Sequence, residues 1–143
     1  MNKGKKLILA GVVICLLSVI GIYKYLDTNY KNYFTISDVK WDGDARWWTE
    51  NSGGNEYNIK FKHFNGKCIK KINFNKSNCD IKINSKTQSG DLNIKIYDSE
   101  KILFNKNGIL DEIIKISNIH NKGVKIEITG KEAKSGYFKL KAM

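Results

Sequence analysis

Hydrophobic and polar residues alternate one by one along most of the chain after residue 33. Tyr57, Ile59 and Phe61, for example, are separated by single polar residues. Successive side chains of a strand point to opposite faces, so this pattern predicts strands with one face on a core and the other in water. The same alternation is found in residues 56–64, 67–74, 79–84, 92–97, 102–104, 124–129 and 137–142.

Turn-forming segments separate these stretches. Asn65-Gly66 is a pair that favours the two-residue turn of a β-hairpin, and polar or glycine-bounded segments follow at 75–78, 85–91, 105–108 and 130–136. Only residues 109–119 leave the choice between strand and helix open. The chain is therefore predicted to be all-β, with roughly seven to nine short strands in a two-sheet antiparallel sandwich over residues 34–143.

The N-terminus carries a different pattern, a hydrophobic run without a single charge. It extends from Leu7 to Ile22. As a helix this run would reach about 24 Å, and the flanking Tyr23 and Tyr25 extend it toward the thickness of a membrane core, about 30 Å. We therefore expect one transmembrane helix inside an anchor segment of residues 1–26, with membrane contact through residues 7–23 and a connector at 27–33.

The charges beside this run set its expected orientation. Lys3, Lys5 and Lys6 precede it and only Lys24 follows closely, which favours a cytoplasmic N-terminus and a C-terminal domain outside the membrane. A cleaved signal peptide is the alternative, but no Ala-x-Ala cleavage pattern occurs near the end of the run. A lipoprotein signal is not expected, because Cys15 follows Val-Ile in the middle of the run.

The chain is strongly basic. Its formal net charge is +11, and the first 25 residues hold four lysines and no acidic residue, so most of the excess belongs to the β domain. Such a domain attracts anionic surfaces, such as lipid head groups or wall polymers, while plain solubility is the alternative explanation. Nucleic acid is not an expected partner. Its binding uses aromatic and basic residues interleaved on one face, whereas these lysines are spread over the polar side of every predicted strand.

Three segments in the second half of the chain resemble a known family. They read Ser-Gly-Asp-Leu-Asn-Ile-Lys-Ile from Ser89, Gly-Val-Lys-Ile-Glu-Ile-Thr-Gly from Gly123 and Ser-Gly-Tyr-Phe-Lys-Leu from Ser135. Their order is similar to that in bacterial secreted jelly-roll domains of the pre-peptidase C-terminal type, over the stretch from Asp91 to Leu140. The resemblance implies a jelly-roll-like sandwich and an exported accessory or binding module without catalysis.

The segment between residues 38 and 50 holds the most distinctive candidate chemistry. Trp41, Trp47 and Trp48 could form an aromatic patch that stacks on sugar rings or rests in a lipid interface, or they could be core and sheet-covering residues. Asp-Gly-Asp at 42–44 offers too few oxygen ligands for Ca²⁺. A hydrolase would need two converging carboxylates in this segment, drawn from Asp38, Asp42, Asp44 and Glu50.

The cysteines and histidines offer few other sites. Cys68 and Cys79 are candidates for a disulfide in the exported domain, with two buried thiols as the alternative. His63 and His120 are far apart and lack other ligands at metal-binding spacing, and the sequence has no nucleophile elbow, phosphate loop or zinc motif. We therefore expect no metal, no cofactor and no catalysis.

Together these features predict a single-pass cell-membrane protein whose extracytoplasmic β-sandwich is a binding or interaction module at the cell envelope. The expected partner is another envelope protein or an anionic wall polymer, bound through a basic face with residues 41–48 as the anchor. The alternatives are a small envelope hydrolase or carbohydrate-processing enzyme, and a purely structural role.

Overall fold

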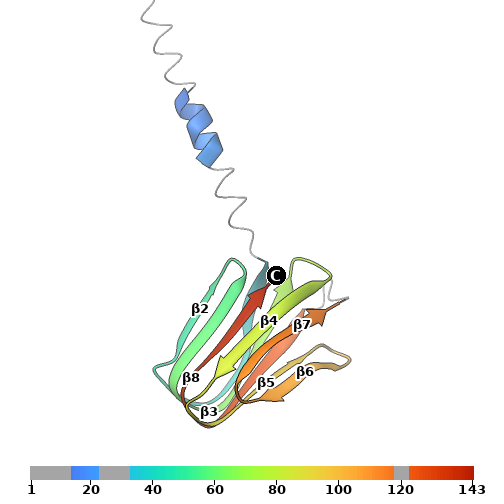
Figure 1. The fold of residues 1–143 in the computed structure, drawn as a ribbon. Helices are drawn as coiled ribbons and strands as arrows, with labels where there is room; N and C mark the ends of the chain where they lie inside the picture. Colours follow the sequence, from blue (N-terminus) through green and yellow to red (C-terminus); the bar gives the residue numbers. More distant parts are fainter. Residues whose placement is uncertain (1–13, 23–32, 118–122) are drawn as a thin grey trace, which may run out of the picture. The chain divides into compact units, whose positions relative to one another are not determined.

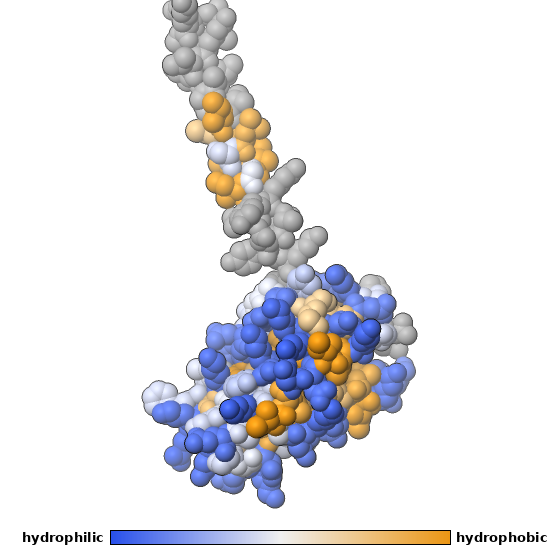
Figure 2. Space-filling model, viewed as in Figure 1, coloured by the Kyte–Doolittle hydropathy of each residue, from blue (hydrophilic) through white to orange (hydrophobic). Residues whose placement is uncertain are grey.

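The computed structural model describes residues 14–22, 33–117 and 123–143, and the chain divides into two compact units, Met1–Lys31 and Asn32–Met143. In the first unit, residues 14–22 form a helix whose hydrophobic side chains are exposed (Figure 2). Among the described residues, no helix combines the length and hydropathy needed to cross a membrane. The remainder of the expected span and nearly all of the expected connector, as well as His120, lie outside the described residues.

The second unit is built from antiparallel strands, as the alternation predicts (Figure 1). Every pairing between the strands of the described residues is antiparallel. The strands are β1 (Phe34–Arg46), β2 (Thr49–Gly53), β3 (Glu56–Phe74), β4 (Cys79–Lys86), β5 (Ser89–Tyr97), β6 (Ile102–Asn107), β7 (Leu110–Ile116) and β8 (Val124–Ala142).

Two long strands, β3 and β8, run through the whole sheet and pair with each other along most of their length. The first part of β3 pairs with β2 and its later part with β1. In the same way, the first part of β8 pairs with β5 and its last part with β4. The short strands β6 and β7 complete the sheet beside β5 and β4. Each long strand therefore belongs to two groups of neighbours.

These two groups lie over each other, because β3 bends in its middle. The backbone of Tyr33 donates a hydrogen bond to Gly54, just before β3 begins, and accepts one from Asn75, just after β3 ends. The two ends of the strand are thus next to each other. The bend contains an irregularity in register between Phe64 and Gly66. The folded sheet forms a β-sandwich, with β2 and β4 in one layer and β1 and β5 in the other.

A single hydrophobic core fills the space between the layers. Alternate residues of the strands point into it, as in the buried series Leu92, Ile94 and Ile96 of β5. Its largest fully buried side chains also include Tyr57, Phe64 and Phe138. Hydrophilic residues cover most of the visible outer surface of this unit, with smaller hydrophobic groups between them (Figure 2). The core faces and the wet faces of the strands therefore follow the alternation in most stretches, with the exposed Ile102 and the buried Lys70 as exceptions.

The predicted hairpin turns at 65–66 and 130–136 are wrong, because both segments lie inside the long strands β3 and β8. Gly66 (φ +141°) faces Gly43 of β1 (φ +155°), and a Cβ at either position would collide with the backbone of the opposite strand. Glycines let two backbones approach and bend here without ending the pairing. A turn signal in the sequence therefore marks a bend. The ambiguous stretch at 109–119 contains a strand, β7.

Candidate functional site

The three tryptophans do not form one platform. Trp48 is partly buried, with its ring centroid 5.1 Å from that of Phe64. The ring of Trp41 packs edge-on against the ring of Trp48, with a centroid distance of 4.7 Å. Trp47, between β1 and β2, is 76% exposed and carries the ammonium group of Lys62 over its ring at 4.9 Å. Trp41 and Trp48 thus close the edge of the core, with Trp41 still half exposed, and Trp47 is the most exposed of the three.

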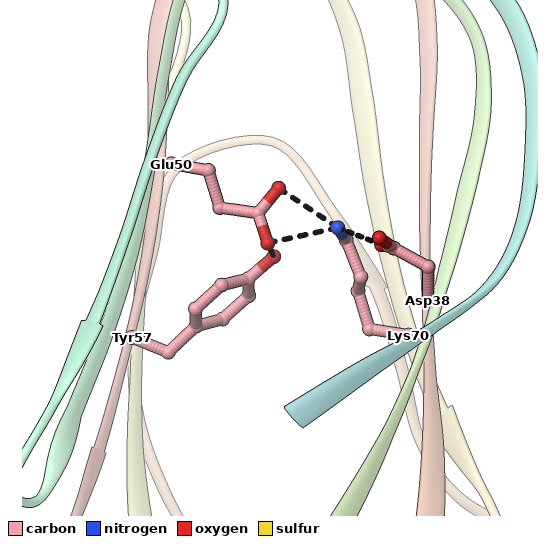
Figure 3. Close-up of polar contacts among 4 residues, drawn as sticks. All are labelled: Asp38, Glu50, Tyr57 and Lys70. Carbon is pink, nitrogen blue, oxygen red and sulfur yellow. Dashed lines mark hydrogen bonds and ion pairs between the residues drawn. The ribbon is translucent and has the colours of Figure 1, made fainter. Parts of the chain in front are cut away.

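A cluster of polar residues lies between the two layers at the edge formed by β1 and β2 (Figure 3). The ammonium group of Lys70 donates to both carboxylate oxygens of Glu50, each at 2.8 Å, and to Asp38. The hydroxyl of Tyr57 donates to Glu50 at 2.9 Å. Glu50 comes from one layer and Lys70 from the other, so the cluster links the layers where they are open. We call these four residues the ion-pair clasp.

The electrostatics of the clasp favour a structural role over acid–base chemistry. Burial alone would lower the pKa of Lys70, but its hydrogen bonds to Asp38 and Glu50 outweigh burial, so the pKa is raised and the side chain stays charged. Burial and the charge of Glu50 raise the pKa of Tyr57, which stays neutral. Neither group can act as a base near neutral pH.

The acids of the segment from 38 to 50 fall into two sets. Asp38 and Glu50 converge on one another, as a hydrolase would require, but the ammonium of Lys70 lies between them where a reacting atom would have to sit. Asp42 instead contacts the exposed Lys40 at 3.3 Å, and Asp44 is exposed on the same strand. Among the parts of the chain that the structure describes, no group of three metal-ligating side chains is found.

Cys68 and Cys79 are free and buried, the second of the two alternatives for this pair. They lie on β3 and β4, which are consecutive in sequence but do not pair with each other. Cys68 faces Trp41 and Ile128 in register, whereas Cys79 faces Ile116. Burial raises the pKa of Cys68 to about 11, so this thiol is protonated and unreactive at neutral pH.

A broad concave feature lies on the outer face of the layer that contains β2, β3, β8 and β4. It is a cavity of about 790 Å³. The side chains that point into it come from the polar positions of the alternation, and they meet because the strands pair in this order. Asn51 faces Asn58, Asn58 faces Lys139, and Lys139 faces Asn84. We call this surface the cationic face. Its lining comprises Asn51, Glu56, Asn58, Lys60, Lys82, Asn84, Tyr137, Lys139 and Lys141, with Ile59 and Phe138 beneath.

Positive charge exceeds negative charge in this cavity. Lys139 and Lys141 both contact Glu56, at 2.9 and 3.2 Å, and these contacts lower the pKa of Glu56. Lys82 contacts Asp111 of β7 at 2.8 Å. Lys60 has no ion-pair partner within the described ranges 14–22, 33–117 and 123–143. Four lysines therefore line the cavity beside one carboxylate.

The cationic face also offers groups suited to hydroxyl-bearing ligands. The amides of Asn51, Asn58 and Asn84 can each donate and accept hydrogen bonds. The hydroxyl of Tyr137 donates to the side-chain oxygen of Asn84 at 2.6 Å, which orients that amide. Ammonium groups for anions and amides for hydroxyls are thus combined in one cavity.

Comparison with known proteins supplies no family. No protein-family model and no curated protein matches the chain. The expected assignment to the pre-peptidase C-terminal type is therefore not shown, although the β-sandwich that the resemblance implies is present.

Several solved structures are similar to the chain at low sequence identity. The secreted serine protease VesC from Vibrio cholerae has a TM-score of 0.48 and 9% identity, covering 84% of this chain, which spans only 26% of that protease. A family 11 carbohydrate-binding module from Clostridium thermocellum, in complex with a mixed-linked tetrasaccharide, has a TM-score of 0.39 and 7% identity over 80% of this chain and 90% of the module. A CBM4 structure has a TM-score of 0.38 and 11% identity, with coverages of 78% and 85%. All three TM-scores are below 0.5, and we take no function from them.

Proposed function

We propose that the chain is a non-catalytic binding module for an anionic polymer of sugar or polyol units, held at the outer surface of the cell by its N-terminal segment. The cavity of the cationic face is the observation that supports this function best. Its lysines attract a negatively charged chain, and its amides and Tyr137 can hydrogen-bond the hydroxyl groups of the same chain. An envelope protein is the second partner class, and the experiment below distinguishes the two.

The open position of the cavity suits a polymer. Its lining comes from the outer face of four neighbouring strands, so a chain can lie across the strands and continue beyond them at both ends. A small-molecule site is typically more enclosed and more apolar than this one. Binding through ammonium groups also predicts a marked dependence on salt, since exposed charges are screened over about 10 Å at 0.1 M ionic strength.

The proposed anchor rests on the sequence. The uncharged run from Leu7 to Ile22 follows three lysines, the arrangement expected of a segment that stays in the membrane with its N-terminus in the cytoplasm. Within the described part of this run, residues 14–22 are helical and display hydrophobic side chains. An anchor of this kind would hold the β-sandwich close to polymers of the cell envelope.

The test measures binding of the full-length chain, purified in mild detergent, to a glycerol-phosphate polymer and to neutral dextran. We expect binding to the charged polymer alone, and a loss of roughly tenfold in affinity for the double variant Lys60→Gln, Lys139→Gln, about 1.4 kcal/mol. The matched control is Lys71→Gln, Lys125→Gln, which removes two lysines that face each other in the other layer.

Three outcomes contradict the proposal. Equal binding to dextran would remove the role of charge. An equal loss in the control variant would show that total charge matters and the cavity does not. Absence of binding to any charged polymer, together with a stable complex with another envelope protein, would favour the second partner class.

A further inference from the structure

A second, smaller cavity lies at the end of the same sheet, where β1, β3 and β8 meet. Its volume is about 490 Å³. Arg46 faces His63 across β1 and β3, and His63 faces Lys134 across β3 and β8, so these three residues form one row over three strands. Its complete lining is Arg46, Trp47, Lys62, His63, Glu132 and Lys134.

The charges of this cavity are poorly balanced. Three cations line it, and within the part of the chain that the structure describes neither Arg46 nor Lys134 makes an ion pair. The ammonium group of Lys62 lies over the ring of Trp47. The single carboxylate, Glu132, contacts Nε2 of His63 at 3.4 Å. The cavity therefore holds an excess of positive charge that the described residues do not compensate.

One buried polar atom of a residue that lines the cavity also lacks a partner. The Nδ1 atom of His63 is buried and makes no hydrogen bond to any described residue, although the side chain as a whole is 24% exposed. A buried imidazole nitrogen without a partner is costly, and this cost falls on a residue that lines the cavity. His63 is the middle residue of the row formed by Arg46, His63 and Lys134.

The backbone around the cavity is held in an unfavourable conformation. Trp47 (φ +56°) and Glu132 (φ +49°) are two of the three non-glycine residues with positive φ among those described. Left-handed backbone is disfavoured for side chains other than glycine and is concentrated at ligand-binding sites. At Trp47 it presents a large ring to solvent beside the three cations, and Trp47 is the most exposed of the three tryptophans.

We infer that this cavity binds a phosphate monoester carried on a sugar or polyol unit, with the ring against Trp47 and the phosphate among Arg46, Lys62 and Lys134. Aromatic rings pack against the apolar faces of sugars, and guanidinium and ammonium groups bind phosphate oxygens. A phosphate monoester carries a charge of about −1.5 to −2 at neutral pH, which matches three cations better than a carboxylate does. The inference rests on the proposed function, since it names the chemical group that the module recognises on its polymer.

The two cavities follow one another along β3. Lys60 lines the larger cavity and Lys62, two residues further along the strand, lines the smaller one. A polymer that lies on the cationic face can therefore place a phosphorylated end or branch in the smaller cavity.

Isothermal titration calorimetry of the full-length chain in detergent tests the inference with glucose 6-phosphate, glucose, glucuronate and inorganic phosphate as probes. We expect glucose 6-phosphate to bind roughly tenfold more tightly than any of the other three. Trp47→Ala should lower the affinity for glucose 6-phosphate to about that for inorganic phosphate, because only the ring contact is lost. Arg46→Gln should weaken both phosphate-containing probes, whereas the control Lys125→Gln should change neither.

The inference is overturned if glucose 6-phosphate binds no better than inorganic phosphate, or if Trp47→Ala leaves its affinity unchanged. Glucuronate binding as tightly as glucose 6-phosphate would also overturn it, since a carboxylate would then suffice. Trp47 and Arg46 are exposed, so their variants should keep the circular dichroism spectrum of the wild-type chain. Polymer binding that depends on Lys60 and Lys139 would support the proposed function even if the smaller cavity bound nothing.

Discussion

The ion-pair clasp yields the most direct prediction about stability. Substituting Lys70→Met removes the ammonium group and keeps an unbranched hydrophobic side chain of similar length. The Lys70 side chain is only 5% exposed, so water cannot reach the vacated position easily. Glu50 loses two hydrogen bonds of 2.8 Å and keeps the one from Tyr57.

The expected loss follows from the exposure of the two carboxylates. Removing one partner from a fully buried ion pair costs about 3 to 5 kcal/mol, whereas an exposed pair contributes about 0 to 1 kcal/mol. The Asp38 side chain is 84% exposed and that of Glu50 is 32% exposed, so water replaces much of what the carboxylates lose. We expect Lys70→Met to lower the free energy of unfolding by about 2 kcal/mol.

Urea denaturation of the full-length chain, followed by tryptophan fluorescence, measures this loss. The double variant Lys70→Met, Glu50→Gln leaves no carboxylate without its cation at this position of β2. Its loss in free energy of unfolding should therefore be smaller than the sum of the losses in the two single variants by about 1 kcal/mol. Unchanged stability of Lys70→Met, or strictly additive effects, would show that the clasp does not hold the layers together.

The pH dependence of the same contact has a defined sign. The pKa of Lys70 is raised above its ordinary value of 10.5 in the folded chain. A raised pKa means that the contribution of the lysine is complete below the unfolded pKa and is lost as pH rises through the folded pKa. The difference between wild type and Lys70→Met should therefore be constant near neutral pH and shrink only in strongly alkaline solution.

Three further predictions concern the bend, the buried thiol and the anchor. Gly66→Ala should destabilise the chain by about 2 to 3 kcal/mol in urea denaturation, whereas Gly54→Ala, where no atom lies near the added Cβ, should cost only about 1 kcal/mol. The pKa of Cys68 is raised from 9.0 to about 11, so the stability of the folded chain should fall as pH rises through this range. Thermal unfolding should show a smaller fall for Cys68→Val than for wild type. A full-length chain should resist carbonate extraction from membranes, and deletion of residues 7–22 should release it; ready extraction of the intact chain would contradict the anchor.

The alternation of hydrophobic and polar residues predicted most strands from residue 56 onward, whereas β1 and β2 were not among the predicted stretches and β7 was left open between strand and helix. Ile81 and Ile83 of β4, for instance, point into the core while Lys82 and Asn84 point outward. Pairing was harder to predict, because alternation says nothing about which strands are neighbours. A pair such as Asn65-Gly66 provides a positive φ, and a positive φ serves a bend in a long strand as well as the turn of a hairpin.

The candidate site shows the same difference between features that are local in the sequence and features that depend on strand pairing. The acids and tryptophans between residues 38 and 50 could be selected from the sequence, since they are clustered along the chain. The cationic face could not, because Asn51, Asn84 and Lys139 come from separate strands and meet only through the pairing of β2 and β4 with β3 and β8. Lysine at an outward position is also the ordinary choice for solubility, so no single lysine stood out.

The burial pattern of β3 changes phase between Phe61 and Phe64, within the bend of the strand, and this change connects these features. Before it, odd-numbered residues such as Ile59 point into the core and Lys60 and Lys62 point outward. After it, even-numbered residues point inward, which buries Lys70. A shift of one residue moves every following side chain to the opposite face. Without this change of phase Lys70 would lie on the surface and the clasp could not form, so the bend allows a single strand to line both cavities on its outer face and to place Lys70 on its inner face at the open edge.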